Sequence, residues 1–185
     1  MAEYYLVSQL PSLDIVDDNM PLPIDEKRFL ELCCSFLKKK AYSEIEKLTL
    51  VPQLESRKSY SSLLDNWYEG ERNLRLALAK ARAEKMNKSF EVTEASFSDE
   101  LISLAGEAVR MENPLEAEKF LLNYRLKFLE SLRPSDTFAE DFLFYYGLKL
   151  KLITRMRQFD KKLGEEAYRN IYNSILGGER MEGKK

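Results

Sequence analysis

The chain has 185 residues, a formal net charge of −2 and a pI near 5.5, so its overall charge offers no basis for binding a nucleic-acid backbone. With 44% hydrophobic and 32% charged residues, the composition is that of a globular domain long enough to bury a core. Histidine is absent. This excludes zinc, Ser-His, Cys-His and Glu-x-x-His di-iron chemistry in their usual forms.

The remaining bulk features predict a cytoplasmic protein. No apolar run approaches the roughly 20 residues that a membrane-spanning helix needs. The first residues do not combine a basic segment with an apolar stretch, as a signal peptide would. The two cysteines, Cys33 and Cys34, are adjacent within a helical pattern, which predicts small buried side chains in a reducing compartment.

Residues 1–22 are predicted to form an N-terminal arm. The run from Tyr4 to Val7 is aromatic and β-branched, which favours a short strand or a tight irregular element over residues 3–9. Prolines 11, 21 and 23 then predict an extended stretch from residue 11 to residue 23.

The first unit, residues 23–88, is predicted to contain three helices. An apolar stripe of 3.6-residue period predicts a helix over 25–40, with Lys38-Lys39-Lys40 at its C-terminal end, where the helix dipole favours cations. Ser43 and Glu46 form a capping-box pattern, which predicts a short second helix that Pro52 ends. Apolar residues at three- and four-residue intervals predict a long helix over 59–88.

A polar linker over 89–97 separates this unit from a second one, residues 98–178. The second unit is predicted to hold a helix from 98 to 111 and another from Pro114 to Leu132, the latter capped by Asn113. Ser135 or Asp136 is predicted to cap a long helix that reaches residue 163. A final helix runs from Tyr168 to the Gly177-Gly178 pair, and a disordered tail spans 179–185.

The chain repeats part of its own sequence. Residues 23–30 are echoed by residues 114–121 as proline, aliphatic, acid, base, Phe and Leu in the same order, and residues 67–72 are echoed more weakly by 144–149. Two copies of a proline-started helix followed by a long helix predict an all-α fold of two repeated helical units with long antiparallel helices. Gly70 and Gly147 lie within the weaker echo. Glycine in the interior of a helix costs about 1 kcal/mol relative to alanine, so we expect close helix approach or a shared kink there.

Charged residues interrupt the apolar stripe of each long helix at Glu71 and at Lys149. Two interpretations stay open: the two side chains pair as a buried salt bridge that sets the register of the helices, or the stripe ends there and both charges face solvent. The second is favoured, because the two stripes are one residue out of phase when the echo is aligned.

Five aromatic residues fall within nine positions, from Phe138 to Tyr146, more than a single helix face can bury. Core packing explains most of them, and the remainder indicates a surface for a partner. The predicted partner surface consists of Tyr68, Glu71, Arg72, Arg75, Phe144, Tyr145, Tyr146 and Lys149.

Residues in the first third of the chain resemble a known family. The segment 4–11 (Tyr-Tyr-Leu-Val-Ser-Gln-Leu-Pro), followed by Pro23, Phe29-Leu30 and Cys33, is similar to the bacterial domain-of-unknown-function family 2764. That resemblance implies an association with bacterial V-type ATPases, in the place of the C subunit (the eukaryotic d subunit). The C-subunit family is all-α, caps the membrane rotor ring and seats the central stalk. Its aromatic-acid-x-x-Asn-Leu-Arg type motif is similar to residues 68–75 here (Tyr-Glu-Gly-Glu-Arg-Asn-Leu-Arg).

The resemblance therefore implies a non-catalytic subunit or accessory protein without a cofactor or metal, which contacts the stalk and the rotor ring and reaches the membrane only through them. A general helical adaptor with another partner is the alternative. A third hypothesis is a magnesium-assisted hydrolase, whose carboxylates would come from the acids Glu69, Glu71, Asp136, Glu140 and Asp141.

Overall fold

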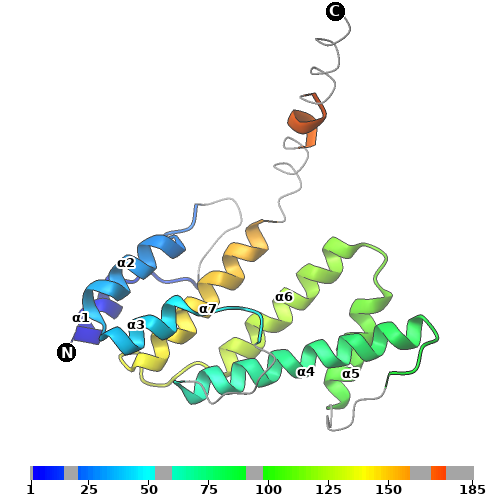
Figure 1. The fold of residues 1–185 in the computed structure, drawn as a ribbon, viewed down its shortest axis with the longest axis horizontal. Helices are drawn as coiled ribbons and strands as arrows, with labels where there is room; N and C mark the ends of the chain where they lie inside the picture. The colour runs from blue at the N-terminus through cyan, green and yellow to red at the C-terminus, as the bar shows by residue number, and fades with distance from the viewer. Residues whose placement is uncertain (1, 15–20, 53–59, 91–97, 159–167, 174–185) are drawn as a thin grey trace, which may run out of the picture.

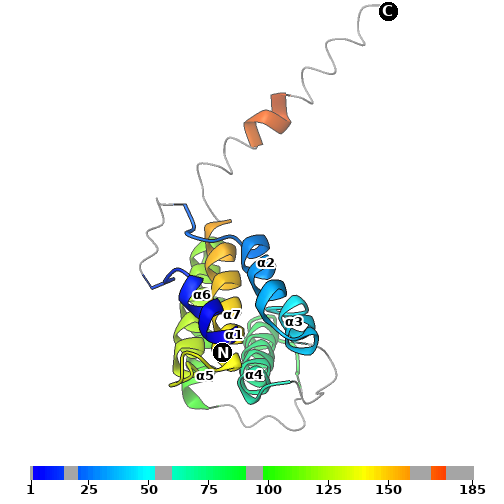
Figure 2. The same ribbon diagram turned by 90° about the vertical axis from the view of Figure 1, so that its left-hand side faces the viewer.

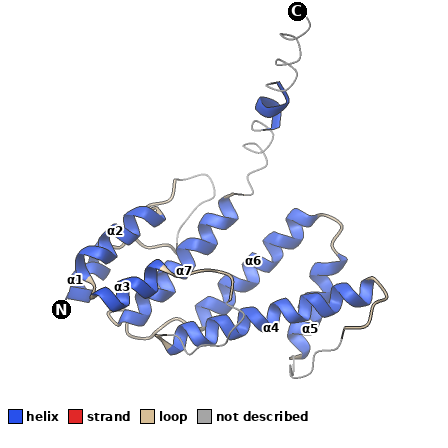
Figure 3. Ribbon diagram, in the orientation of Figure 1, coloured by secondary structure: helices blue, strands red, loops and turns tan. Residues whose placement is uncertain are grey.

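The computed structural model describes residues 2–14, 21–52, 60–90, 98–158 and 168–173, and within these ranges the regular structure is entirely helical, with no strand (Figures 1 and 3). This confirms the predicted all-α class. Residues 168–173 are also helical. No described helix is both long and apolar enough to cross a membrane. The labelled helices are α1 (Ala2–Gln9), α2 (Glu26–Phe36), α3 (Lys39–Glu46), α4 (Ser62–Lys85), α5 (Asp99–Arg110), α6 (Pro114–Ser131) and α7 (Glu140–Arg157).

Helices α4, α5 and α6 begin where side chains cap them. The side-chain oxygens of Ser61, Ser98 and Asn113 accept hydrogen bonds from backbone N–H groups in the first turn of α4, α5 and α6, at 3.1, 3.3 and 3.0 Å respectively. Each bond satisfies a donor that the helix itself leaves unpaired. The predicted helices over 59–88, 98–111 and 114–132 are confirmed to within a few residues at each end.

The strand-like prediction for the N-terminal segment is wrong, because residues 2–9 form α1. Leu6 is completely buried in the larger of two hydrophobic cores, with Val7 and Leu10 packed beside it. Leu6 and Leu10 are four residues apart, the spacing that places side chains on one helix face. Packing of this face against α2 outweighs the β-propensity of the aromatic and β-branched run.

The predicted helix over 25–40 is two helices. Leu37 is extended (φ −93°, ψ 155°) and ends α2, and α3 begins at Lys39. The three lysines therefore stand at the start of a helix rather than at its end, and Ser43 lies inside α3 rather than at its cap. The break lets both helices pack against α7. Of the two cysteines, Cys33 is buried as predicted, but Cys34 is exposed.

The predicted cap of the last long helix is also displaced. α7 begins at Glu140, and its N-cap residue Ala139 makes no side-chain capping bond. Asp136 instead accepts a hydrogen bond from the backbone N–H of Phe138 at 2.9 Å, a local turn that competes with helix formation. The predicted continuation of α7 over 159–163, the linker over 91–97, residues 174–178 and the tail over 179–185 lie outside the described residues.

Two hydrophobic cores share α4 and α6. The larger core surrounds α7, which lies between α6 and α2 (Figure 2) and is apolar around most of its circumference from Leu143 to Leu152, as a central helix must be. It draws on residues from both predicted units. The smaller core joins α5 to the C-terminal half of α4 and the start of α6 (Figure 1). Its buried members are Leu74, Ala77, Leu78, Leu101, Ala105, Ala108 and Leu121.

Both glycines of the echo lie at close contacts between elements. A Cβ atom on Gly70 would lie 2.3 Å from the ring of Phe128 in α6, and one on Gly147 would lie 2.9 Å from Leu48 and 3.1 Å from Phe29. The absence of a side chain at each position therefore admits a large neighbour, which supports the close-approach interpretation.

Candidate partner surface

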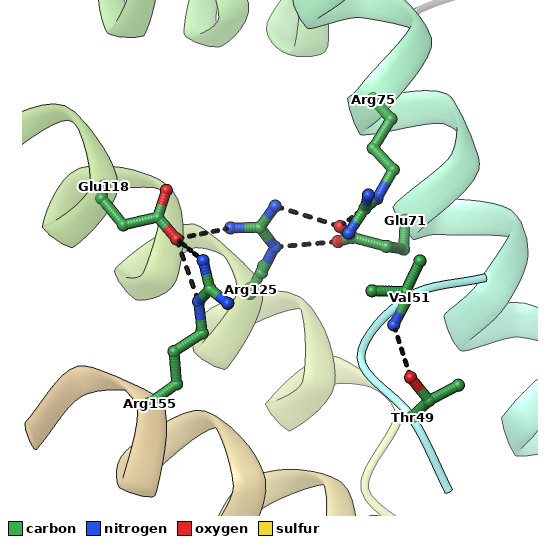
Figure 4. Close-up of polar contacts among 7 residues, drawn as sticks. All are labelled: Thr49, Val51, Glu71, Arg75, Glu118, Arg125 and Arg155. Carbon is green, nitrogen blue, oxygen red and sulfur yellow. Dashed lines mark hydrogen bonds and ion pairs between the residues drawn. The ribbon is translucent and has the colours of Figure 1, made fainter. Parts of the chain in front are cut away.

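Glu71, predicted for the partner surface, is the most deeply buried charged residue among the described part of the chain, with 2% of its surface exposed. Its two carboxylate oxygens accept hydrogen bonds from Arg125 of α6, at 2.9 Å from Nε and 3.0 Å from Nη2. Arg75, one turn further along α4, donates from Nε at 2.8 Å (Figure 4). Paired N–H groups of this kind fix both the distance and the plane of the two side chains.

The chain of charges continues to α7. Arg125 Nη1 lies 4.0 Å from Glu118 Oε1, and the same oxygen accepts hydrogen bonds from Nε and Nη2 of Arg155 at 3.1 and 2.8 Å (Figure 4). We call Glu71, Arg75, Arg125, Glu118 and Arg155 the arginine–glutamate network. It connects α4, α6 and α7 through alternating charges, of which the central pair is removed from solvent: the side chain of Arg125 is 12% exposed.

Arg125 was not predicted as a functional residue, although the sequence of α6 contains a pattern that indicates it. It falls on the same stripe of α6 as the buried residues Leu121, Leu122 and Leu129, so it is a basic residue in an apolar stripe, as Glu71 is an acidic one. A buried charge requires a partner of the opposite sign. Pairing the acidic residue in the stripe of α4 with the basic residue in the stripe of α6 would have predicted the Glu71–Arg125 ion pair.

Lys149 has different partners, so the hypothesis that it pairs with Glu71 is wrong. Lys149 Nζ forms an ion pair with Asp14, lies 3.5 Å from Glu130 and donates to the hydroxyl of Tyr145 at 3.2 Å. The alternative, in which each apolar stripe ends at its charged residue and both side chains face solvent, is also wrong for Glu71, which is buried. Lys149 is intermediate, with 13% of its side chain exposed.

The groups around Lys149 have shifted proton affinities. Burial alone would lower the pKa of Lys149, but its hydrogen bonds to Asp14 and Tyr145 outweigh that effect and raise it. The pKa of Tyr145 is raised to about 12 by burial and by the hydrogen bond that it donates to Glu130. A tyrosine with a raised pKa holds its proton more tightly at neutral pH. The cluster therefore connects α7 to α6 and to the N-terminal arm and has a structural role.

Asp14→Asn should lower the free energy of unfolding at pH 7 by less than about 1 kcal/mol, because the side chain of Asp14 is half exposed. The hydrogen bond from Lys149 lowers the pKa of Asp14 below its ordinary value of 3.8. Its contribution is therefore present above pH 3.8 and lost as the pH falls through the lower pKa of the folded protein. Urea unfolding of both proteins at neutral pH and in strong acid checks this. A difference that persisted in acid would contradict it.

The aromatic residues predicted for the partner surface are buried, which corrects that part of the prediction. Phe144, Tyr145 and Tyr146 lie in the larger core, and the hydroxyl of Tyr146 donates to the carbonyl oxygen of Pro11 at 2.8 Å. Burial raises the pKa of Tyr146. Phe138 is the exposed member of the run, at 46%, and it stacks on Tyr4 of α1 with ring centroids 4.7 Å apart.

Three residues of the predicted surface stay accessible. Arg75 is exposed, and Tyr68 and Arg72 are half-buried. All three lie on α4 within residues 68–75. The partner surface that this structure allows is therefore the outer side of α4 around residues 68–75, backed by the arginine–glutamate network.

The acids proposed for a magnesium site do not gather. Glu71 is occupied by arginines, Glu140 accepts a hydrogen bond from the hydroxyl of Tyr60 at 3.0 Å, and Asp136 caps its own turn. Across the described ranges, no group of three or more acidic or cysteine side chains is placed to hold a metal ion.

Comparison with known proteins gives one match. No curated protein and no solved structure is detectably similar to the chain. Residues 96–179 match the model of the family described as "Protein of unknown function (DUF2764)". The match falls on the second predicted unit, whereas the residues that carried the resemblance on the sequence are in the first third. It therefore supports, from a separate part of the chain, the resemblance to the DUF2764 family.

Proposed function

We propose that this protein is a non-catalytic helical subunit or accessory protein of a bacterial V-type ATPase, in the manner of a C subunit that links the central stalk to the membrane rotor. In this proposal it is cytoplasmic and reaches the membrane only through its partner subunits. No reaction is assigned to it. Its task is mechanical: to hold two partner surfaces at a fixed separation.

The contacts of residues 68–75, the segment that resembles the C-subunit motif, carry this proposal. Glu71 and Arg75 belong to the arginine–glutamate network, Gly70 receives the ring of Phe128, and Leu74 lies in the smaller core. The motif is thus used to fix α4 against α6. A component that transmits load needs helices held in one register, and bidentate arginine–carboxylate pairs provide that specificity.

We further propose that the two sequence copies are structural copies, each with its long helix, α4 or α7, packed antiparallel to a neighbour. Gly70 and Gly147 support this because each admits a large apolar side chain from another element. A solved structure of the complex would test it: superposition of α4 and α7 with their neighbours should bring these two glycines to equivalent places.

Native co-purification tests the proposed function. The protein is tagged, membranes are solubilised in mild detergent, and associated proteins are identified by mass spectrometry. We expect the A, B and D subunits and the rotor ring. Arg72→Glu should reduce their recovery, whereas Lys119→Glu, an equal charge reversal at an exposed position on α6, should not.

Two results would count against this function. Recovery of a different, reproducible partner would favour the general adaptor. A monomer that brings no partner would contradict both, and calorimetric titration with magnesium would then test the hydrolase hypothesis.

A further inference from the structure

An apolar groove is open at the end of the molecule that lies away from α1 (Figure 1). Its volume is about 540 Å³, and its walls come from the C-terminal half of α4, the end of α5 and the start of α6. We call it the α4–α6 groove. Leu78, Ala108 and Leu121 of the smaller core form part of its lining, and Met86, which also lines it, is 58% exposed. Apolar surface that continues from a core into solvent marks a site for a partner, and methionine adapts to many partner shapes.

The walls of the groove suit a helix better than an extended peptide. The regular structure of the described residues is entirely helical, so none of it presents a strand edge to which an extended peptide could add. Among the described residues, no aromatic side chain lines the groove, whereas sites for proline-rich peptides are lined by aromatic rings. The apolar side chains of three helices form the lining instead, and such a surface receives the apolar face of another helix.

The unbalanced charge at the groove is positive. Arg82 lines it from α4, is exposed and has no carboxylate partner among the described residues. The ammonium group of Lys85 donates to a neutral acceptor, the backbone carbonyl oxygen of Val109, at 2.6 Å, so its charge is not balanced there. Glu118 is acidic and also lines the groove, but its carboxylate already accepts two hydrogen bonds from Arg155. A carboxylate from a partner would therefore meet two cations.

The two cations lie on one wall of the groove. Leu78, Arg82 and Lys85 follow each other at intervals of four and three residues, the spacing of side chains on one helix face. The positive charges thus continue the apolar stripe of α4 towards its C-terminal end. A complementary helix would carry its acidic residues along one edge of its own apolar stripe, and charge pairs at such a rim determine the orientation of the partner more than the affinity.

We propose that the α4–α6 groove binds an amphipathic helix of another protein. The apolar stripe of that helix packs between α4 and α6, and carboxylates along one edge of the stripe pair with Arg82 and Lys85. The groove shares no residue with the surface around residues 68–75, so α4 can serve two partners at once. The proposal does not depend on the V-type ATPase assignment.

The binding of three synthetic helical peptides to the full chain tests this proposal. The peptides share leucines at i, i+3, i+4 and i+7 and differ along one edge of that stripe, which holds glutamate, glutamine or lysine. We expect the glutamate peptide to bind about fivefold more tightly than the glutamine peptide, the upper range for an exposed ion pair, and the lysine peptide to bind most weakly. Added salt should reduce these differences. Fluorescence anisotropy of labelled peptides measures the affinities.

Methyl NMR shows where the glutamate peptide binds. Met86 and Met111 line the groove, whereas Met156 packs against the larger core. Binding should shift the methyl signals of Met86 and Met111 and leave that of Met156 in place. Binding of none of the peptides, or a shift of the Met156 signal without the other two, would overturn the proposal.

Two variants separate the charge of the groove from its apolar lining. Arg82→Glu should abolish the preference for the glutamate peptide, whereas Lys127→Glu, a charge reversal at an exposed position of α6 outside the groove, should preserve it. Ala117→Phe places a large side chain in the groove and should weaken the binding of all three peptides at least tenfold. A preference for glutamate that survives Arg82→Glu would contradict the proposed charge pairing.

Two further results would assign the groove to a different occupant and so overturn the proposal. A glutamate peptide with two central prolines cannot stay helical. If it bound as tightly as the original peptide, the groove would accept an extended chain. In sedimentation of the protein alone, a concentration-dependent dimer that Ala117→Phe abolishes would show that a second copy occupies the groove.

Discussion

Glu71→Gln should lower the free energy of unfolding by about 3–5 kcal/mol, the usual result of removing one partner from a buried ion pair. The amide keeps the size of the side chain but not its charge. Arg125, with 12% of its side chain exposed, then retains a positive charge that Glu118 alone must balance from 4.0 Å. Urea unfolding at neutral pH measures the loss.

A control on the same helix separates this effect from a general change in α4. Glu69 is exposed, so Glu69→Gln should change the free energy of unfolding by less than about 0.5 kcal/mol. Replacing both members of the pair, as Glu71→Gln/Arg125→Gln, should cost less than the sum of the two single changes, because no buried charge is then left unpaired and Arg75 is exposed. Additive losses would show that the two side chains do not stabilise each other.

Gly70→Ala should destabilise the protein by about 1–3 kcal/mol, the range for overpacking a core, although alanine is favoured over glycine in a helix by about 1 kcal/mol. The new methyl group would lie 2.3 Å from the ring of Phe128. That ring is held between Trp67 and Tyr124, with centroids 6.0 and 6.4 Å away, so it cannot move aside freely. Thermal or urea unfolding measures the change.

The same substitution at Gly106 should have the opposite sign. Gly106 lies inside α5, and a Cβ atom there would meet nothing within 4 Å. Gly106→Ala should therefore stabilise the protein by about 0.5–1 kcal/mol, the difference in helix propensity. Phe128→Leu should relieve part of the cost of Gly70→Ala by shortening the opposing side chain. Stabilisation by Gly70→Ala would contradict the close contact between α4 and α6.

The helices that could be predicted closely are those whose start is encoded locally. Ser98 before an acidic first turn, and Asn113 before Pro114, act through bonds to backbone N–H groups two or three residues away. The internal echo likewise identified Gly70 and Gly147 as unusual. Glycine destabilises a helix interior, so its presence at both places indicates that another part of the fold comes close there.

The errors arise where distant residues decide the structure. The segment 4–7 favours a strand by itself, and it is helical because Leu6 is buried in a core with residues of α2 and α7. The break at Leu37 serves packing on α7 in the same way. The burial of Glu71 depends on Arg125, which is 54 positions away. A periodicity argument examines one helix at a time, so it located the unusual charge but not its partner.

The division into two cores bears on the order in which the protein can fold during synthesis. The smaller core uses residues from Leu74 to Leu121, so it can close once α6 has begun to emerge. The larger core needs α7, whose residues 143–152 lie in one cluster with residues as early as Leu6 and Leu13. Closing such a long loop costs more chain entropy and is slower than forming local contacts. Helices α1 to α3 are therefore made early and must keep their apolar faces from misassociating until α7 leaves the ribosome.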